Sequence, residues 1–418
     1  MKQFDITYFY GPPSEYIVKE ECVADIAASG MTLCQLFQNT AEANKQALPL
    51  LKKYGMKANI FETRITELIR SKDISAVDAI VKEVVEDYSG FDNIAGWDIS
   101  DEPDSEMFPM LSAVTSAFRK YSPNQEVVIN LYPNYATPEM YKDTDYLTHL
   151  KRFVEIVDPD FLSYDHYHFM GRKKKKRSTA SAAEEERERL IRLAAEQSED
   201  RDDFFENLED VRRIGLKHNL EQMLIILLTE HGCCRNLTRA EILWEVNMCL
   251  VYGMHRISYF TYWLPGSDDD EDNEDTRYWS WDNAMCDRHG NKYEHYYDVQ
   301  AINKEIYPIG NRLFKTKSKE VYHIGKTEKG TRAFQPYGHI TDIEGENVVV
   351  GFFEDGCVYL VNRDFKQENT IVLYADEPFE IYHAGCFEPS EKTRKITLSA
   401  GAGVLMRWNA SRMDYEGE

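Results

Sequence analysis

The chain has 418 residues, of which 43% are hydrophobic, and its formal net charge is −23. This length and hydrophobic content support two domains with sizeable cores. The negative charge repels nucleic acid and anionic lipid, and no stretch reaches the roughly 20 apolar residues that a membrane helix needs, so we expect neither nucleic acid nor a membrane as a partner.

Short apolar or aromatic runs that end in polar residues recur along the first three quarters of the chain, as β-strands do. Helix-like segments lie between them and are bounded by cap residues such as Gly30, Gly55 and Asn236. The helix-like segments include Glu15–Ser29, Ala41–Tyr54, Asp73–Tyr88 and Thr238–Tyr252. The expected strands are Phe4–Tyr10, Met31–Gln38, Lys57–Arg64, Ile94–Glu102, Glu126–Asn134, Phe161–Phe169, Met223–Gly232 and Arg256–Pro265.

This alternation predicts parallel strands joined by right-handed crossovers. Eight strand–helix units favour an α/β fold of the closed (β/α)8 type, the TIM barrel, over residues 1–316. No glycine-rich phosphate loop follows the first strand, where Gly11-Pro12-Pro13 stands instead. A dinucleotide-binding fold is therefore disfavoured, and we expect no cofactor.

The pattern changes near residue 317, where β-type runs replace the alternation. Turn signals such as Glu344-Gly345-Glu346-Asn347 separate these runs, and no long helix intervenes. We expect residues 317–418 to form a small antiparallel β-sandwich that buttresses the barrel or forms an interface in a homo-oligomer. Asn303–Phe314 is the expected last barrel helix. The expected strands are Val348–Phe353, Cys357–Asn362, Thr370–Tyr374, Phe379–His383 and Ile396–Trp408.

The eight cysteines have no metal-binding spacing, which favours free thiols in a reducing compartment. A strand is expected from Phe4, which leaves no room for a signal peptide. We therefore expect a cytoplasmic protein, or a secreted one if a leader has been removed.

Two charged runs interrupt the alternation of strands and helices. Arg172–Arg177 is six consecutive basic residues, and Ser267–Asp275 carries seven acidic residues in nine. The first run suggests a nuclear signal or a nucleic-acid patch, and the second suggests calcium. The net charge and the missing calcium-loop glycine and glutamate favour solvated loops in both cases.

Polar and aromatic side chains gather at the expected carboxyl ends of the strands, where barrel enzymes keep their chemistry. Two of these ends finish in a glutamate, Glu102 on the fourth strand and Glu230 on the seventh. Two carboxyl groups that face each other across a barrel mouth at about 5–5.5 Å are the equipment of retaining glycoside hydrolysis. Asp98 and Asp101 favour a protonated Glu102, while His231 and Arg64 are candidates to keep Glu230 ionised. The other candidate substrate contacts are Glu62, Arg64, Asn130, Tyr132, Tyr164, His166 and His168.

The chain resembles clan A of the retaining glycoside hydrolases, loosely the branch that contains the family-forty-two β-galactosidases. Asp101-Glu102-Pro103 matches the Asn-Glu-Pro motif of the clan at the glutamate and the proline, and Glu230 matches its strand-seven glutamate. Trp263 matches a tryptophan at the end of strand eight. The segment from Asp287 to Lys292 resembles the last loop of the clan. The resemblance covers the barrel and extends plausibly to the β domain.

The resemblance implies that Glu102 is the acid/base, Glu230 the nucleophile and Trp263 the floor of the sugar site. Asp101 departs from the clan, whose asparagine contacts the substrate beside the cleaved bond. An aspartate there accepts hydrogen bonds from a sugar hydroxyl but has no amide to donate. It also raises the proton affinity of Glu102.

Two other functions remain open at this point. His166 and His168 stand at i and i+2, on one side of a strand, and with Asp165 they suggest a metal-dependent barrel hydrolase. The first strand lacks the histidines usual for that class, so sugar contacts are favoured and no metal is expected. A catalytically silent carbohydrate-binding barrel is the other alternative. The favoured function is hydrolysis of a β-linked glycoside or oligosaccharide with retention.

Overall fold

The computed structural model describes residues 3–172, 198–266, 281–383 and 385–408. Parallel strands form an eight-stranded sheet in the order β1-β8-β7-β6-β5-β4-β3-β2. A backbone hydrogen bond from Thr32 to Ile6 (2.9 Å) and another from Ile6 N–H to the Thr32 hydroxyl (2.9 Å) join β1 to the start of the β2 segment. The expected (β/α)8 barrel is thus confirmed. Its strands are β1 Asp5–Phe9, β2 Leu33–Leu36, β3 Lys57–Phe61, β4 Ile94–Asp101, β5 Glu126–Leu131, β6 Phe161–His166, β7 Glu221–Leu227 and β8 Arg256–Phe260.

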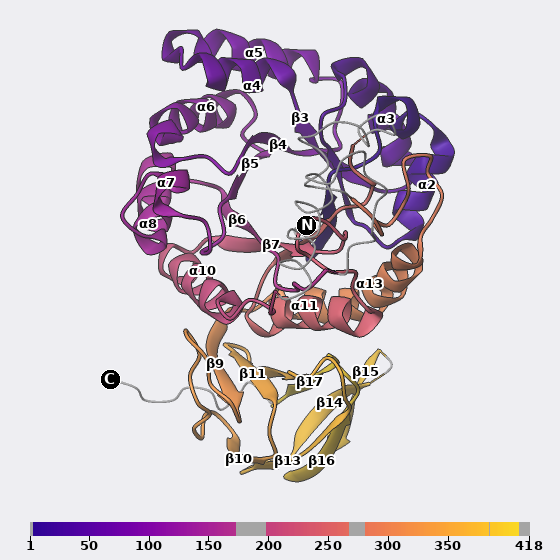
Figure 1. Cartoon of the computed structure of the whole chain (residues 1–418), viewed down its shortest axis with the longest axis vertical. Coiled ribbons are helices and arrows are strands. Elements are labelled where there is room, and N and C mark those ends of the chain that lie inside the picture. The colour runs from indigo at the N-terminus through magenta and orange to yellow at the C-terminus, as the bar shows by residue number, and fades with distance from the viewer. Residues whose placement is uncertain (1–2, 173–197, 267–280, 384, 409–418) are drawn as a thin grey trace, which may run out of the picture.

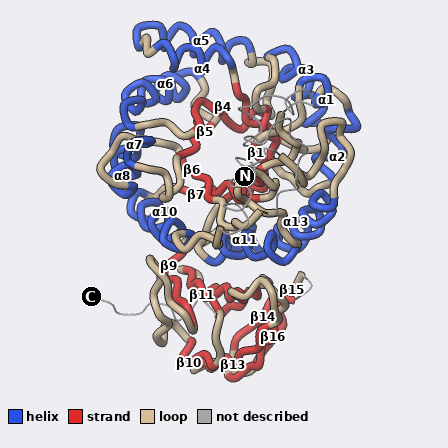
Figure 2. The backbone as a smooth tube through the Cα atoms, in the orientation of Figure 1, coloured by secondary structure: helices blue, strands red, loops and turns tan. Residues whose placement is uncertain are grey.

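Helices surround the strands as an outer ring (Figures 1 and 2). Their ends follow ordinary capping chemistry. Thr238 and Glu241, for example, form a capping box at the start of α11. The helices of the described residues are α1 Ser14–Ile17, α2 Glu20–Ala28, α3 Ala41–Lys53, α4 Thr63–Ser71, α5 Val77–Asp87, α6 Phe108–Tyr121, α7 Pro138–Tyr141, α8 Tyr146–Val157, α10 Phe204–His218, α11 Arg239–Val251 and α13 Glu294–Leu313, with 3₁₀ turns at Ile74–Ala76 and Ser105–Met107.

Alternate residues of each barrel strand point to the barrel interior or to the helices, and both sides are buried. The interior holds a small apolar cluster built from Val128, Phe161, Met223 and Ile225. The partly buried rings of Phe9 and Phe260 pack against this cluster at the ends of β1 and β8. The interior is therefore filled below the mouth, and the open end is the end where the strands finish.

The C-terminal part forms two antiparallel sheets with an apolar core between them, which confirms the β-sandwich. The sheets have the orders β10-β13-β16 and β15-β14-β17-β12-β11-β9. The strands are β9 Ser318–Ile324, β10 Ile340–Glu344, β11 Val348–Phe353, β12 Cys357–Asn362, β13 Asn369–Ala375, β14 Phe379–His383, β15 Cys386–Ser390, β16 Thr393–Leu398 and β17 Gly403–Arg407.

The sandwich packs against α11 on the outside of the barrel (Figure 1). The Tyr359 hydroxyl donates to Asn247 Oδ1 (2.7 Å), and the Trp244 indole donates to the Arg363 carbonyl (2.9 Å). A Cβ on Gly351 would lie 2.1 Å from the Val251 carbonyl oxygen, so only glycine allows β11 to approach the helix this closely. This interface lies on the helix side of the barrel, away from the mouth.

Several expected elements differ in their boundaries. The expected helix Glu15–Ser29 is two helices, because Val18 and Lys19 are not helical and interrupt it. Ile396–Trp408 is two strands separated by a turn at Gly401, which has a left-handed φ of 68°. The N-cap of α11 is Thr238 rather than Asn236, and α13 begins at Glu294, nine residues before the expected start at Asn303.

All eight cysteines are free. Within the described ranges, no helix is both long and apolar enough to cross a membrane. The acidic run Ser267–Asp275 and residues 173–177 of the basic run lie outside the described residues.

One buried carboxyl group stands apart from the site. Glu245 on α11 is fully buried, and among the described residues neither of its side-chain oxygens accepts a hydrogen bond of normal geometry. Burial raises the pKa of Glu245 well above its ordinary value, and repulsion from Glu241 adds to this while the Leu227 backbone opposes it. The folded protein therefore holds a proton here that the unfolded chain releases.

We expect Glu245→Met to raise the free energy of unfolding by about 1–3 kcal/mol near pH 7.5, because it removes an unpaired buried polar group at similar volume. The folded pKa is raised, so the stability from the proton is complete below the unfolded value and is lost as pH rises above it. The gain should therefore be larger at pH 8 than at pH 5 in urea denaturation. Glu245→Gln should also lose this pH dependence, with a smaller gain in the free energy of unfolding. A lower free energy of unfolding in Glu245→Met at both pH values would contradict this interpretation.

Candidate active site

Glu102 is the first residue beyond β4 and is half-buried at the barrel mouth. Its backbone N–H donates to the Asn130 carbonyl of β5 (2.8 Å), and its φ is +46°. A left-handed conformation is uncommon for a residue with a Cβ and is found at sites where the surrounding structure imposes it. The β5 contact therefore holds the Glu102 backbone in an unusual turn directly after the strand.

Three further carboxyl groups form a cluster with Glu102: Asp101 and Asp165 lie near Glu102, and Asp98 lies near Asp101. Asp98 and Asp101 come from β4 and Asp165 from β6. The Asn130 side-chain amide donates to both Asp101 Oδ1 and Asp165 Oδ1, at 3.0 Å each. The Gln35 amide donates to Asp98. Among the described residues, none of the four carboxyl groups takes part in an ion pair, so the cluster is bonded only by neutral donors.

This environment favours protonated carboxyl groups. Burial is the main cause that raises the pKa of Glu102 to about 7, and the charge of Asp101 adds to it, while a hydrogen bond with Asp165 acts in the opposite direction. Asp101 is open to solvent but recessed in the mouth, and desolvation raises its pKa also. The expected effect of Asp101 on Glu102 is present, although burial is the larger cause.

Glu230 lies three residues beyond β7 and has a different environment. Arg172 Nε donates to Glu230 Oε1 (2.7 Å), and the Asn283 amide donates to Glu230 Oε2 (2.7 Å). Paired backbone hydrogen bonds between Glu230 and Asp282, both 2.9 Å, fix the main chain. Each side-chain oxygen thus accepts a hydrogen bond, one of them charge-assisted, which suits an ionised carboxylate.

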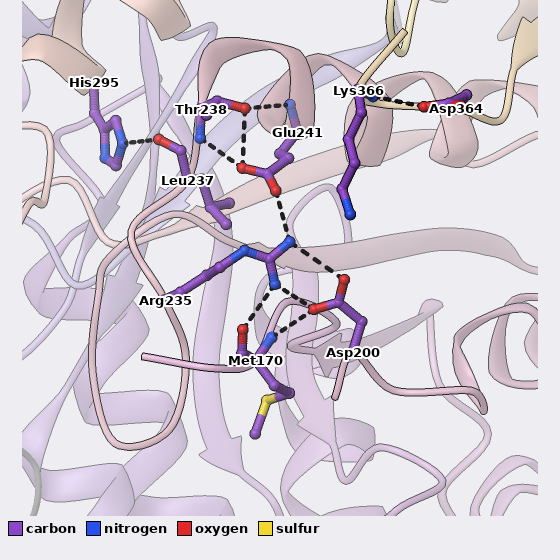
Figure 3. Close-up of polar contacts among 9 residues, drawn as sticks. All are labelled: Met170, Asp200, Arg235, Leu237, Thr238, Glu241, His295, Asp364 and Lys366. Carbon is purple, nitrogen blue, oxygen red and sulfur yellow. Dashed lines mark hydrogen bonds and ion pairs between the residues drawn. The ribbon is translucent and has the colours of Figure 1, made fainter. Parts of the chain in front are cut away.

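The Arg172 side chain is only 7% exposed. A network of polar contacts around Arg235 joins the two loops that bring Arg172 and Glu230 together (Figure 3). Arg235 donates to the Met170 carbonyl (2.8 Å), pairs with Asp200, and donates to Glu241 Oε1 (2.6 Å). The Arg172 backbone N–H also donates to the Cys233 carbonyl (3.2 Å). These contacts fasten the loop after β6 to the loop after β7, and so set where Arg172 meets Glu230.

Tyr167 lies between the carboxyl cluster and the residue that follows Glu230. Its ring packs edge-on against His231, which follows Glu230, with 5.3 Å between ring centroids. The charges of Asp165, Asp101 and Glu102 all contribute to a raised pKa for Tyr167, after burial as the main cause. The half-buried Tyr132 also lies near Glu102: burial is the main cause of the raised pKa of Tyr132, and the charge of Glu102 adds to it. The carboxyl cluster and Glu230 therefore share one mouth.

Neither expected cationic neighbour of Glu230 acts in that way. Burial lowers the pKa of His231 to about 4, so this imidazole is neutral near pH 7, and its Nδ1 bonds the Thr229 carbonyl (2.7 Å). Arg64 bonds Glu62, Glu83 and Asp87 instead. The cation is Arg172, which belongs to the run expected to be solvated and is buried instead.

Partly buried aromatic rings line the mouth. The rings of Phe9, Phe37 and Phe61 contact one another in a row across β1 to β3, with successive centroids 4.9 Å apart. Trp281 stacks on His231 at 4.8 Å and meets Phe260 at 5.8 Å. Apolar ring faces beside hydrogen-bonding carboxyl groups form a surface suited to a sugar ring.

Of the sequence-predicted contacts, Asp101, Asn130 and Tyr132 lie with Glu102. Trp263 does not offer a comparable surface. It is 4% exposed, its ring packs on Tyr16 at 4.8 Å, and Gly290 lies against it. The partly exposed tryptophan near Glu230 is Trp281, which stacks on His231.

The structure turns Tyr164, His166 and His168 away from the mouth. Tyr164 is buried beside Tyr146 and Tyr252 of the helix layer. His166 Nε2 bonds Asp203 (3.0 Å), and His168 stacks on Trp244 of α11 at 5.1 Å. No group of three or more potential metal ligands occurs in the described part of the chain, so the metal-dependent alternative has no ligand set there.

Glu62 and Arg64 are also apart from the pair of glutamates. Glu62 precedes α4, accepts a hydrogen bond from the Tyr88 hydroxyl (3.1 Å) and pairs with Arg64 (3.0 Å). Arg64 continues to Glu83 and Asp87 on α5. These contacts join α4 to α5 at the edge of the barrel.

Sequence reasoning missed Arg172, Asn283 and Phe260, and it considered Asp165 only as a companion of His166 and His168 at a metal site. Asp165 had a signal, because it stands at the end of a barrel strand. Phe260 ends β8 in the same way. Arg172 and Asn283 had none, because they reach Glu230 from 58 and 53 residues away in the chain through loops.

No family model matches the chain, and no curated protein does. Solved structures share its fold. A structure described as a glycoside hydrolase aligns over 97% of this chain and 92% of its own, with a TM-score of 0.56 and 10% identity. A glycoside hydrolase family 5 from Bacteroides vulgatus aligns over 99% and 90%, with a TM-score of 0.56 and 10% identity.

A β-galactosidase from the psychrophilic Marinomonas ef1 aligns over 76% of this chain, with a TM-score of 0.50 and 10% identity. This chain spans 62% of the length of that β-galactosidase. At such identities the likeness establishes a shared fold and no more.

We expect the carboxyl carbon of Glu102 to titrate near pH 7 in ¹³C NMR of glutamate-labelled protein, because burial and Asp101 favour its protonated form. The signal should be absent from Glu102→Gln. Asp101→Asn should lower the titration midpoint, since it removes a neighbouring negative charge. A Glu102 midpoint near the ordinary 4.5 would contradict the described environment.

Proposed function

We propose that the protein is a glycoside hydrolase that cleaves a β-linked glycoside with retention of configuration. The observation that carries the proposal is the contrast between two glutamates at one barrel mouth. Glu102 lies among other carboxyl groups, and its own pKa is raised to about 7. The Glu230 carboxylate accepts hydrogen bonds from a guanidinium and an amide. Opposite protonation states in one site are what double displacement requires.

In the first step, Glu230 attacks the anomeric carbon while the Glu102 carboxyl gives its proton to the leaving oxygen. A covalent glycosyl-enzyme forms and the aglycone departs. In the second step, Glu102, now a carboxylate, takes a proton from water, which displaces Glu230 from the anomeric carbon. The hydrogen bonds from Arg172 and Asn283 hold the Glu230 carboxylate in one orientation for the attack.

The charges at the mouth support a neutral sugar as the substrate. Asp98, Asp101 and Asp165 have no cationic partner among the described residues, and the guanidinium of Arg172 is already engaged by Glu230. The carboxylate of an anionic sugar would lose water beside this cluster and find no cation among the described residues there to pair with. Trp281 and Phe260 are proposed as the apolar platform, in place of Trp263.

The two glutamates should fail differently when substituted. We expect Glu230→Ala to lose turnover of every glycoside, because the nucleophile is gone. Glu102→Ala should lose about 10²–10⁴-fold on a substrate with a poor leaving group. An activated nitrophenyl glycoside, which needs no proton donor, should still glycosylate this variant and then stall.

Added azide should rescue Glu102→Ala with a β-configured glycosyl azide and Glu230→Ala with an α-configured one. Glu221→Gln is the matched control, because Glu221 lies at the opposite end of β7 and pairs with Arg256; its kcat/KM should match that of the unsubstituted protein. Equal and unrescued loss in both variants would remove the assignment of roles. Full activity in either would exclude that residue from the chemistry.

A panel of nitrophenyl glycosides tests the substrate class. We expect neutral β-glycosides to be cleaved, and the β-glucuronide to have a kcat/KM at least about tenfold lower, because its carboxylate would be desolvated beside the acidic cluster without a cation among the described residues to pair with it. Asp101→Asn should narrow that difference. A β-glucuronide that is the best substrate of the panel would contradict the charge argument, and an α-linked preference would contradict the β assignment.

A further inference from the structure

A second carboxyl group contacts the proposed acid. Asp165 comes from β6 and is 4% exposed. The Glu102 backbone N–H bonds the carbonyl of Asn130 (2.8 Å), the same residue whose side chain bonds Asp165, and this shared neighbour brings the two carboxyl groups into hydrogen-bonding contact. Asn130 holds Asp165 through its side-chain amide (3.0 Å), and Ser163 donates to the Asn130 oxygen (2.9 Å). The Ser163 contact sets which end of the amide faces the carboxyl groups. Asp165 is therefore fixed from behind in contact with Glu102.

Two carboxyl groups in contact, without a cation, do not both ionise near neutral pH. Asp165 is the more enclosed of the pair, and burial raises its pKa well above the ordinary value, with the charges of Glu102 and Asp101 as further causes. The proton therefore stays on Asp165 when Glu102 is ionised. A protonated carboxyl is a hydrogen-bond donor, and a carboxylate beside it is the acceptor.

We propose that Asp165 is a positioning residue for the acid/base, one that keeps its own proton throughout the reaction and donates a hydrogen bond to the Glu102 carboxylate. The inference rests on the proposed role of Glu102. In the first step the proton of Glu102 passes to the leaving oxygen, and the electron pair stays on the glutamate. In the second step Glu102 recovers a proton from water. The Asp165 proton is transferred in neither step.

Other groups near the pair have defined effects. Asp101 destabilises the Glu102 carboxylate by repulsion, and Asp98 lies next to Asp101 on β4. Tyr132 and Tyr167 are the first residues beyond β5 and β6. Burial raises the pKa of both, and the charge of Glu102 adds to this, so both remain protonated near neutral pH. Asp165 is the one group among these that opposes the raised pKa of Glu102. Removal of the Asp165 carboxyl group should therefore raise the pKa of Glu102, whereas removal of the Asp101 charge should lower it.

The experiment compares Asp165→Ala, Asp165→Asn and Asp101→Asn by the pH dependence of kcat/KM on a β-glycoside with a poor leaving group. We expect the alkaline limb to move to higher pH in Asp165→Ala, with about tenfold lower activity on this substrate, because a donor to a charged group is lost. The activity of Asp165→Ala on an activated nitrophenyl glycoside should fall much less, because that leaving group needs no proton. Asp165→Asn keeps an N–H donor and should keep the limb close to its original place, whereas Asp101→Asn should move it to lower pH.

Asp160→Ala is the control for folding effects, because Asp160 stands at the opposite end of β6 and bonds Arg119; its pH profile should be unchanged. If Asp165→Ala does not fold, Asp165→Ser is the substitute, because the serine side chain is too short for its hydroxyl to reach Glu102. The alkaline limb of its pH profile should move to higher pH in the same way. An unchanged or lowered alkaline limb in these variants, or an Asn variant that behaves like Ala, would overturn the proposal.

NMR titration of Glu102 in the same variants separates this inference from the proposed function. A midpoint that rises in Asp165→Ala supports the carboxyl pair even if no glycoside is hydrolysed, in which case only the proposed function fails. A midpoint that does not rise overturns the pair even if glycosides are hydrolysed.

Discussion

The parallel direction of the eight barrel strands is the constraint on which the site depends. It brings all their carboxyl ends to one mouth, so that residues far apart in the chain meet there. Glu102 from β4, Asn130 from β5 and Asp165 from β6 are hydrogen-bonded neighbours because their strands are neighbours. The loops then add what the strands do not supply. Arg235 fastens the loop after β6 to the loop after β7, and Arg172 is thereby brought against Glu230.

The mouth is electrically divided. Its β4–β6 side carries carboxyl groups bonded by neutral side-chain amides, while its β7–β8 side carries a carboxylate bonded by a guanidinium and an amide. Buried carboxyl groups without cations hold protons, whereas one with a cation remains charged. The same principle accounts for Glu245, which is buried behind β7 with a raised pKa. Two identical side chains thus acquire different chemistry from their surroundings alone.

Much of the fold could be predicted from the sequence, and the failures have a common cause. β11, β12 and β14 match their expected boundaries, because alternating or apolar runs between clear turns leave little choice. The direction of side chains on β6 could not be predicted, because every residue of Phe161–His166 is buried and hydrophobicity does not mark the inner face. Asp165 faces Glu102, and its neighbour His166 faces Asp203. The prediction that Trp263 forms the sugar platform failed for a similar reason. A residue after a strand can fold back onto the helix layer, and the Trp263 ring packs on Tyr16.

The sequence by itself determined the alternation of strands and helices, the change to β structure near residue 317 and the two glutamates at the strand ends. These depend on local periodicity and on the order of elements, which any stretch of the chain carries within itself. Only the tertiary structure decided which partners those glutamates have. Arg172 and Asn283 meet Glu230 across 58 and 53 residues, and the pKa of Glu102 depends on how deeply β4, β5 and β6 enclose it. Charge, burial and hydrogen bonding at a site are properties of the space around it, and that space exists only once the barrel has closed.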